Sequence, residues 1–64
     1  MTDWQQRVID EKDELDAKLL KLRAFIGSPS WLMMEVADRW LLEKQLTFMN
    51  EYFAVLQQRI ERFK

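Results

Sequence analysis

The residues of this 64-residue chain best suited to chemistry are cations and aromatic rings near its two ends. Arginine and lysine side chains there could bind an anion, because they form charge-assisted hydrogen bonds to phosphate or carboxylate oxygens. Aromatic side chains beside them could stack on a base or another planar group. The predicted ligand-binding residues are Trp4, Arg7, Lys12, Tyr52 and Arg59.

Lys12 is the most informative of these residues, because it stands where the helical pattern expects an apolar side chain, between Val8 and Leu15. One interpretation is a lysine whose stem lies on apolar surface while its ammonium group reaches water near an open end of the fold. The other is a cation that lines a groove for an anion. The sequence leaves both interpretations open.

Carboxylates crowd the first third of the chain, at Asp10, Glu11, Asp13, Glu14 and Asp16. A hydrolase could use two of them, but it would need a pocket that raises the pKa of one. Neighbouring lysines favour a solvated, charged helix face instead. The chain contains no histidine and no cysteine, which excludes a catalytic triad, an imidazole base and a thiolate or imidazole metal cage. We therefore expect no enzymatic activity, no catalytic residue, no metal and no cofactor.

Composition bounds the class of protein. Apolar residues make up 48% and charged residues 33% of the chain, a balance typical of a folded amphipathic helical protein. The net charge of −1 disfavours non-specific binding to nucleic acid. The N-terminal segment lacks the apolar core of a signal peptide, and no apolar run approaches the roughly 20 residues that span a bilayer. We expect a cytoplasmic location without membrane contact.

Two runs of apolar residues with helical spacing position these side chains, one before and one after the single break at Gly27-Ser28-Pro29. They predict one all-α domain over residues 1–64, with a helix at about 4–26, a turn at 27–29, a short helix at about 29–36 and a helix at about 38–63. Asp3 and Asp38 are the expected helix caps. Gly27 is expected to take a left-handed conformation, and Ser28 and Pro29 to begin the short helix.

The two long helices should pack as an antiparallel hairpin, because their lengths match and their connection is short. Pairing their apolar seams places Trp4 near Phe63, and Leu15 near Phe53. A second apolar stripe remains on the last helix, formed by Leu41, Phe48, Tyr52 and Val55. One hairpin has too little core to cover it, so we expect a homo-oligomeric helical bundle.

The sequence also resembles a known family. The residues that carry the resemblance are the segment from Arg7 to Ile26 and the pattern D-x-x-L-L-x-x-Q-L-x-x-M-x-x-Y-x-x-x-L-x-x-R-I from Asp38 to Ile60. They resemble the small helical-hairpin proteins of tailed phages that include the anti-CBASS cyclic-nucleotide sponge and the related hairpin of a Thoeris antagonist. The resemblance covers about residues 4–63. This chain is shorter at both ends than the larger sponges and lacks the segment that supplies a base-stacking aromatic there.

The resemblance implies a homo-oligomer, a hexamer in the sponge, that binds cyclic di- or trinucleotides between protomers without chemistry. It implies a phage protein acting in the host bacterial cytoplasm to evade immunity. Two other functions stay open. The chain could be a hairpin adaptor that binds a protein partner through its apolar stripe, or an RNA-binding dimer that forms a four-helix bundle. Its acidic balance argues against the RNA-binding dimer, because phosphate binding needs a concentrated basic face.

Overall fold

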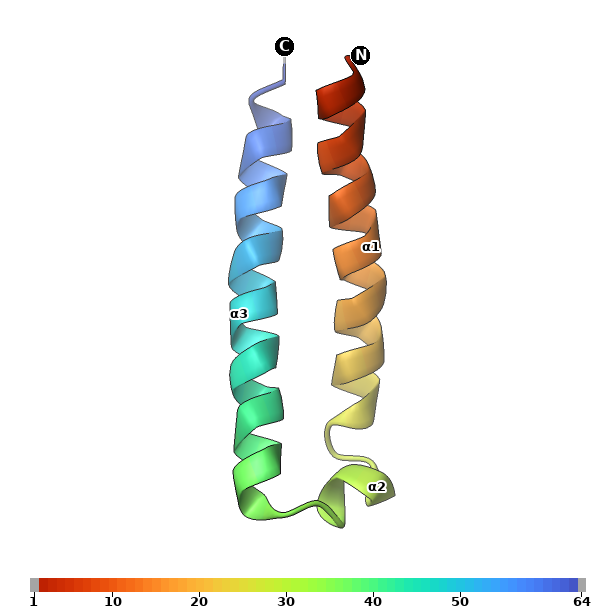
Figure 1. Cartoon of the computed structure of the whole chain (residues 1–64), viewed down its shortest axis with the longest axis vertical. Helices are drawn as coiled ribbons and strands as arrows, with labels where there is room; N and C mark the ends of the chain where they lie inside the picture. The colour runs from red at the N-terminus through yellow and green to blue at the C-terminus, as the bar shows by residue number, and fades with distance from the viewer. Residues whose placement is uncertain (1, 64) are drawn as a thin grey trace.

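Two long helices lie side by side in the computed structural model, which describes residues 2–63 (Figure 1). Helix α1 spans Asp3–Phe25, the short helix α2 spans Pro29–Leu32, and helix α3 spans Val36–Glu61. The described residues contain no strand. α1 and α3 run antiparallel, so both ends of the chain lie at one end of a rod that measures 47 × 15 × 13 Å. The predicted all-α hairpin with a short helix at its connection is confirmed.

The start of α1 corrects one prediction. Thr2, and not Asp3, is the N-cap: its hydroxyl accepts a hydrogen bond from the backbone N–H of Gln5 at 3.4 Å. The Gln5 side chain accepts one in return from the backbone N–H of Thr2 at 3.1 Å. This reciprocal capping box needs a hydroxyl residue three positions before a glutamine or glutamate. Asp3 is the first helical residue, where its charge still suits the positive end of the helix.

The connection begins as predicted. Gly27 has a φ of 89°, the left-handed conformation that glycine adopts without steric cost. The Ser28 hydroxyl then accepts a hydrogen bond from the backbone N–H of Trp31 at 3.2 Å, and Pro29 occupies the first turn of α2. These residues reverse the chain within a few positions.

The end of the connection differs from the prediction. α2 stops at Leu32 and not near residue 36, and α3 begins at Val36 and not near Asp38. Glu35 is the N-cap of α3, with an extended backbone and no side-chain cap bond, so the prediction that Asp38 caps this helix is wrong. Asp38 lies inside the first turn, where its carboxylate favours the helix through the macrodipole. Residues 36–38 are therefore helical and the break lies before them.

The core is a single seam between α1 and α3. Leu19 and Leu56 are the most buried of its side chains, at 1% and 0% exposure, and Val8 and Leu15 are buried beside them. Further apolar residues of the predicted seam pack against this cluster: Leu46, Met49, Phe53, Ile60 and Phe63. The predicted contact between Trp4 and Phe63 is present, with ring centroids 5.1 Å apart in an edge-to-face arrangement. The core is thin, as expected of one hairpin.

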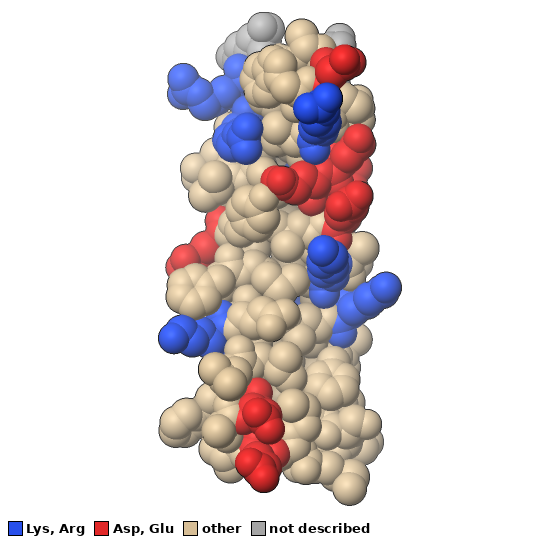
Figure 2. All heavy atoms as spheres, in the orientation of Figure 1, with Lys and Arg blue, Asp and Glu red and all other residues tan. Residues whose placement is uncertain are grey.

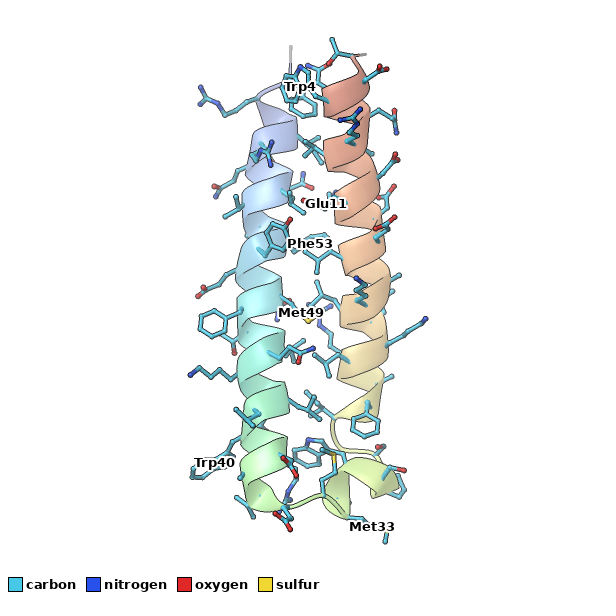
Figure 3. The ribbon with its side chains drawn as sticks, in the orientation of Figure 1. Trp4, Glu11, Met33, Trp40, Met49 and Phe53 are labelled. Carbon is cyan, nitrogen blue, oxygen red and sulfur yellow. The ribbon has the colours of Figure 1, made fainter. Side chains whose placement is uncertain are left out.

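Much apolar surface stays exposed on a single chain. All four residues of the second stripe are exposed, namely Leu41, Phe48, Tyr52 and Val55. A second exposed group lies at the turn end of the rod and includes Met33, which is 88% exposed, and Trp40, which is 69% exposed. Figure 3 shows both of these side chains pointing away from the hairpin. Among the described residues, no helix is long and apolar enough to cross a membrane.

Candidate functional site

The end of the rod where the chain begins and ends carries a shallow depression of about 390 Å³, called here the open-end depression. Its described lining consists of Trp4, Arg59, Arg62 and Phe63. Trp4 comes from the first turn of α1, Arg59 from the last turn of α3, and Phe63 holds the Trp4 ring by the edge-to-face contact. Lysine and arginine side chains gather at this end on the face shown in Figure 2. The depression therefore combines two guanidinium groups with an exposed indole.

Tyr52 lies on α3 within electrostatic reach of Arg59, and it links the two helices. Its hydroxyl donates a short hydrogen bond to the Glu11 carboxylate on α1. This bond raises the pKa of Tyr52 above its usual value, partial burial and the negative charge of Glu11 raise it further, and the nearby Arg59 guanidinium opposes them. The interhelical bond was not predicted, because Glu11 was assigned to a solvated face.

Lys12 and Arg7 lie outside the described lining of the depression. The Lys12 ammonium group sits over the Phe53 ring, 5.3 Å from its centroid, and the side chain is half-buried. This cation–π contact partners the charge within the seam, and it fits the interpretation in which the stem of the lysine lies on apolar surface. Arg7 is exposed on α1.

The five predicted binding residues thus fall into three groups. Trp4 and Arg59 share the open-end depression, Tyr52 lies within electrostatic reach of Arg59, and Arg7 and Lys12 stand apart from the lining. Their roles in binding stay predictions. Sequence reasoning missed Arg62, although a signal existed: it follows Arg59 by three positions, a spacing that places two side chains on one helix face.

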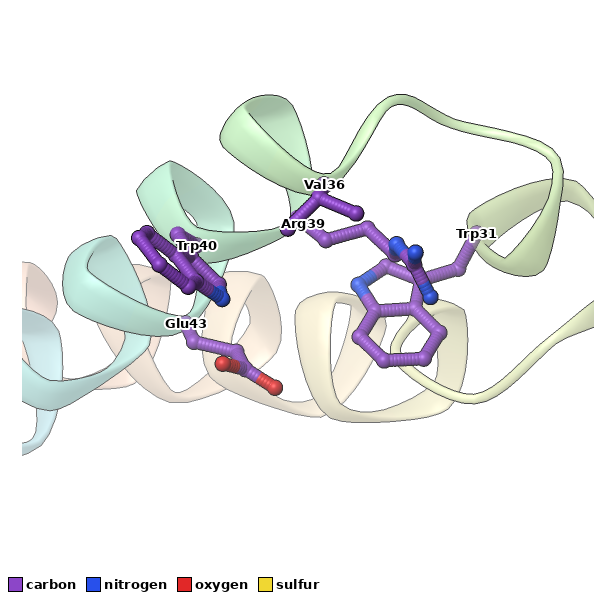
Figure 4. Close-up of a pocket in the computed structure, with 5 residues that line it drawn as sticks. All are labelled: Trp31, Val36, Arg39, Trp40 and Glu43. Carbon is purple, nitrogen blue, oxygen red and sulfur yellow. The ribbon is translucent and has the colours of Figure 1, made fainter.

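A second hollow, of about 160 Å³, lies at the opposite, turn end of the rod (Figure 4). It is called here the turn-end pocket and is lined by Trp31, Val36, Arg39, Trp40 and Glu43. The Arg39 guanidinium carbon lies over the Trp31 ring, 5.2 Å from its centroid. The sequence carries a sign of this pocket, because Arg39, like Lys12, is a charge on an apolar seam position. Each of these seam cations lies over an aromatic ring.

Two N–H groups of the turn-end pocket are buried without an acceptor among residues 2–63. They are Nε1 of Trp31 and Nε of Arg39. A buried donor that lacks a partner costs roughly 1–3 kcal/mol, so such groups are uncommon in folded proteins. Their position identifies the turn-end pocket as a second candidate site.

The crowded carboxylates of α1 do not form a site in the described part of the chain. Asp10, Asp13, Glu14 and Asp16 are exposed, and Asp10 accepts a hydrogen bond from Gln6 at 3.0 Å. No three histidine, cysteine, aspartate or glutamate side chains of residues 2–63 are placed to hold a metal ion. Figure 2 shows acidic side chains gathered along α1 on the face in view.

The antiparallel pair of long helices, with its short connecting helix, defines the chain as a small α-helical hairpin protein. The chain belongs to the Sequestin family, which it matches over residues 2–62. It is also similar to the 7.5 kDa protein of the denB-rIIB intergenic region of Enterobacteria phage T4, with 34% identity over 64 residues that cover the whole of both chains. No solved structure matches it. The expected relationship to a family of small phage proteins is thereby supported.

Proposed function

We propose that this chain is a phage protein that sequesters a cyclic di- or trinucleotide signal of bacterial immunity without altering it. The family name denotes sequestration, and a relative of the same length is encoded by a phage. The observation that carries the proposal is the meeting of Trp4, Arg59 and Arg62 in the open-end depression. Guanidinium groups suit phosphates, and an exposed indole suits a base.

Sequestration needs affinity rather than catalysis. Binding sites must outnumber the messenger, and the Kd must lie below the messenger concentration at which its effector responds. Each charge-assisted hydrogen bond from an arginine to a phosphate contributes about 1.5–3 kcal/mol, and a cyclic dinucleotide offers two phosphates. The proposed place of action is the cytoplasm of the host bacterium, and no reaction step is assigned to any residue.

A second copy of the chain would deepen the depression. The spacing of the apolar stripe on α3 continues past Tyr52 and Val55 to Arg59 and Arg62, in steps of three and four residues. A protomer that covered the stripe would therefore reach over the two arginines and close the site. We propose a homo-oligomer with ligand pockets between protomers, a hexamer if the resemblance to the sponge extends to assembly.

The exposed stripe also favours one other function, that of an adaptor for a protein partner. An adaptor would cover the stripe with a different protein and would need no nucleotide. RNA binding is less well supported, because the acidic band on α1 interrupts any basic face (Figure 2).

Calorimetric titration against a panel of cyclic di- and trinucleotides and cyclic ADP-ribose isomers tests the proposal. We expect at least one ligand to bind, with fewer sites than chains, and to be recovered chemically intact after the protein is denatured. Arg59→Gln should weaken this binding at least tenfold, since it removes the charge from the depression. Lys21→Gln is the control for loss of a positive charge, because Lys21 is exposed on α1 and lies outside the depression. Absence of binding across the panel would favour the adaptor.

A further inference from the structure

We propose that the turn-end pocket is a separate binding site that accepts a guanine base. It lies at the other end of the 47 Å rod from the open-end depression, so the two sites do not share residues. The proposal goes beyond the sequestration described above, because it assigns a base and a contact set to a part of the molecule that sequestration at the open end does not use.

The turn-end pocket is lined by aromatic and charged side chains that suit a planar ring. Figure 4 shows the indoles of Trp31 and Trp40 on either side of the hollow, with the Glu43 carboxylate below the gap. Trp40 is 69% exposed, so one face of its ring is free to stack. The Arg39 guanidinium lies over the Trp31 ring and also lines the hollow, so it can reach the edge of a bound ring. A ring entering the hollow could thus stack on Trp40 while Arg39 faces its edge.

The charges of the pocket select the kind of planar ligand. A cationic group, such as a lysine or arginine side chain of a partner, would meet the positive charge of Arg39 on entry. A purely anionic ligand would meet Glu43. A guanine base suits both residues, because it carries acceptors, N7 and O6, on one edge and N–H donors, N1 and N2, on the next. Arg39 can donate to the first edge while Glu43 accepts from the second.

The same logic disfavours adenine. Adenine presents an acceptor at N1, which a carboxylate repels, and an amino group in place of O6, which a guanidinium cannot donate to. Nε1 of Trp31 and Nε of Arg39 are buried and find no acceptor within the described chain, so the terminal N–H groups of Arg39 are the donors that make this side of the pocket a donor wall. A base with two acceptors on one edge satisfies a donor wall.

The test is calorimetric titration with guanosine monophosphate and adenosine monophosphate as probes. We expect guanosine monophosphate to bind at least tenfold more tightly than adenosine monophosphate. Glu43→Gln should remove most of this preference, because a glutamine amide cannot accept two hydrogen bonds from the guanine edge in the way a carboxylate does. Glu51→Gln is the matched control, since Glu51 is also exposed on α3 but lies outside the pocket. Trp40→Phe should retain most binding and Trp40→Ala should lose it.

Several outcomes would overturn the proposal. Equal affinity for the two nucleotides, or equal effects of Glu43→Gln and Glu51→Gln, would show that the turn-end pocket does not recognise guanine selectively. Absence of guanosine monophosphate binding would also refute the proposal. A change in the mass of the protein by light scattering with Trp40→Ala, without nucleotide binding, would assign the pocket to a contact between copies of the chain.

The two proposals can fail separately. If Arg59→Gln abolishes binding of guanosine monophosphate and Glu43→Gln does not, the nucleotide binds at the open end and the turn-end site is refuted. If the cyclic nucleotide panel gives no binding but Glu43→Gln still removes a guanine preference, the turn-end site stands and the sequestration proposal fails. Circular dichroism melting of each variant checks that the hairpin is folded.

Discussion

At the scale of single residues, the most informative contacts are those that tie a charged or polar side chain of α1 to an aromatic ring of α3. Glu11 accepts a hydrogen bond from Tyr52, and Lys12 lies over Phe53. These two contacts are adjacent in sequence on both helices. They link α1 and α3 through polar groups beside the apolar seam, and a hydrogen bond from Arg23 to Asn50 does the same nearer the turn.

The Tyr52 contact predicts an unusual titration. Because its pKa is raised above the usual value of 10.0 in the folded protein, the contact stabilises the fold at pH values below 10. This stabilisation is lost as the pH rises through the folded pKa, when the tyrosinate and the Glu11 carboxylate repel each other. Tyr52 is the only tyrosine of the chain, so ultraviolet absorbance of tyrosinate measures its pKa directly.

The matched variants for this titration are Glu11→Gln and Glu14→Gln. We expect Glu11→Gln to lower the pKa of Tyr52 toward 10.0, because it removes the negative charge of the hydrogen-bond acceptor. Glu14→Gln should leave the pKa unchanged, since Glu14 is exposed on α1 and makes no described contact with Tyr52. A pKa that does not move in the Glu11 variant would place the tyrosine hydroxyl in water.

Lys12→Met separates the two interpretations of the seam lysine. Methionine keeps the unbranched stem and can contact the Phe53 ring through sulfur, so it replaces a cation–π contact that contributes about 0.5–1 kcal/mol. We expect the free energy of unfolding, measured by urea titration, to stay within about 1 kcal/mol of the parent value. A structural lysine would leave nucleotide affinity unchanged, whereas a lysine in the ligand groove would lower it at least tenfold.

At the scale of elements, the hairpin depends on a reversal made by three consecutive residues. Gly27 turns the chain out of α1, Ser28 caps α2 and Pro29 begins it. A Cβ atom added at Gly27 would meet no neighbouring atom within 4 Å, so the backbone conformation alone resists substitution. Substitutions at Gly27 therefore test the backbone conformation of the turn without a steric clash.

Gly27→Ala should destabilise the protein by about 1 kcal/mol. An L-residue in the left-handed region costs roughly 1–2 kcal/mol, and the lower entropy of the unfolded chain offsets part of that. Gly27→Asn should lose less, because asparagine tolerates this conformation better than alanine does. Urea denaturation of the three proteins gives the comparison. Equal stability of the alanine variant and the parent would mean that the turn has another backbone conformation in solution.

At the scale of the whole molecule, a rod 15 Å wide cannot cover its own apolar surface. The seam covers one face of α3, and the stripe that includes Phe48 and Val55 lies on another. Exposed apolar surface of this extent is typical of a protein interface. The oligomer expected from the sequence stays a prediction, and it follows from the exposure of this stripe.

Phe48→Glu should dissociate the oligomer. The added carboxylate would be buried in the contact between chains without a partner, which is strongly unfavourable. Ala54→Glu is the control, because Ala54 is exposed on α3 but belongs neither to the core cluster nor to the stripe. Light scattering at micromolar concentration should give a mass above 7.9 kDa for the parent and the control, and a lower mass for Phe48→Glu. A folded parent monomer of 7.9 kDa would contradict the prediction.

The sequence by itself was sufficient for the number of long helices, the place of the break and the seam between them. Helical periodicity, a lone Gly-Ser-Pro and the reach of local capping side chains are properties of neighbouring residues, so they can be read without the fold. The predictions that were wrong concerned the ends of helices. The capping box of Thr2 and Gln5 displaced Asp3 as the cap, and α3 began at Val36, before the aspartate expected to cap it.

Only the tertiary structure decided which side chains meet across the helices. The predicted binding group separated, with Arg59 joining Trp4 in the depression and Lys12 turning onto Phe53. Contacts between helices depend on how two faces are rotated toward each other and on which rotamers long side chains adopt. Sequence spacing gives the face of a residue but not these rotations. For the same reason Arg39 and Trp31, which lie on different helices, were found as a pair only in the folded chain.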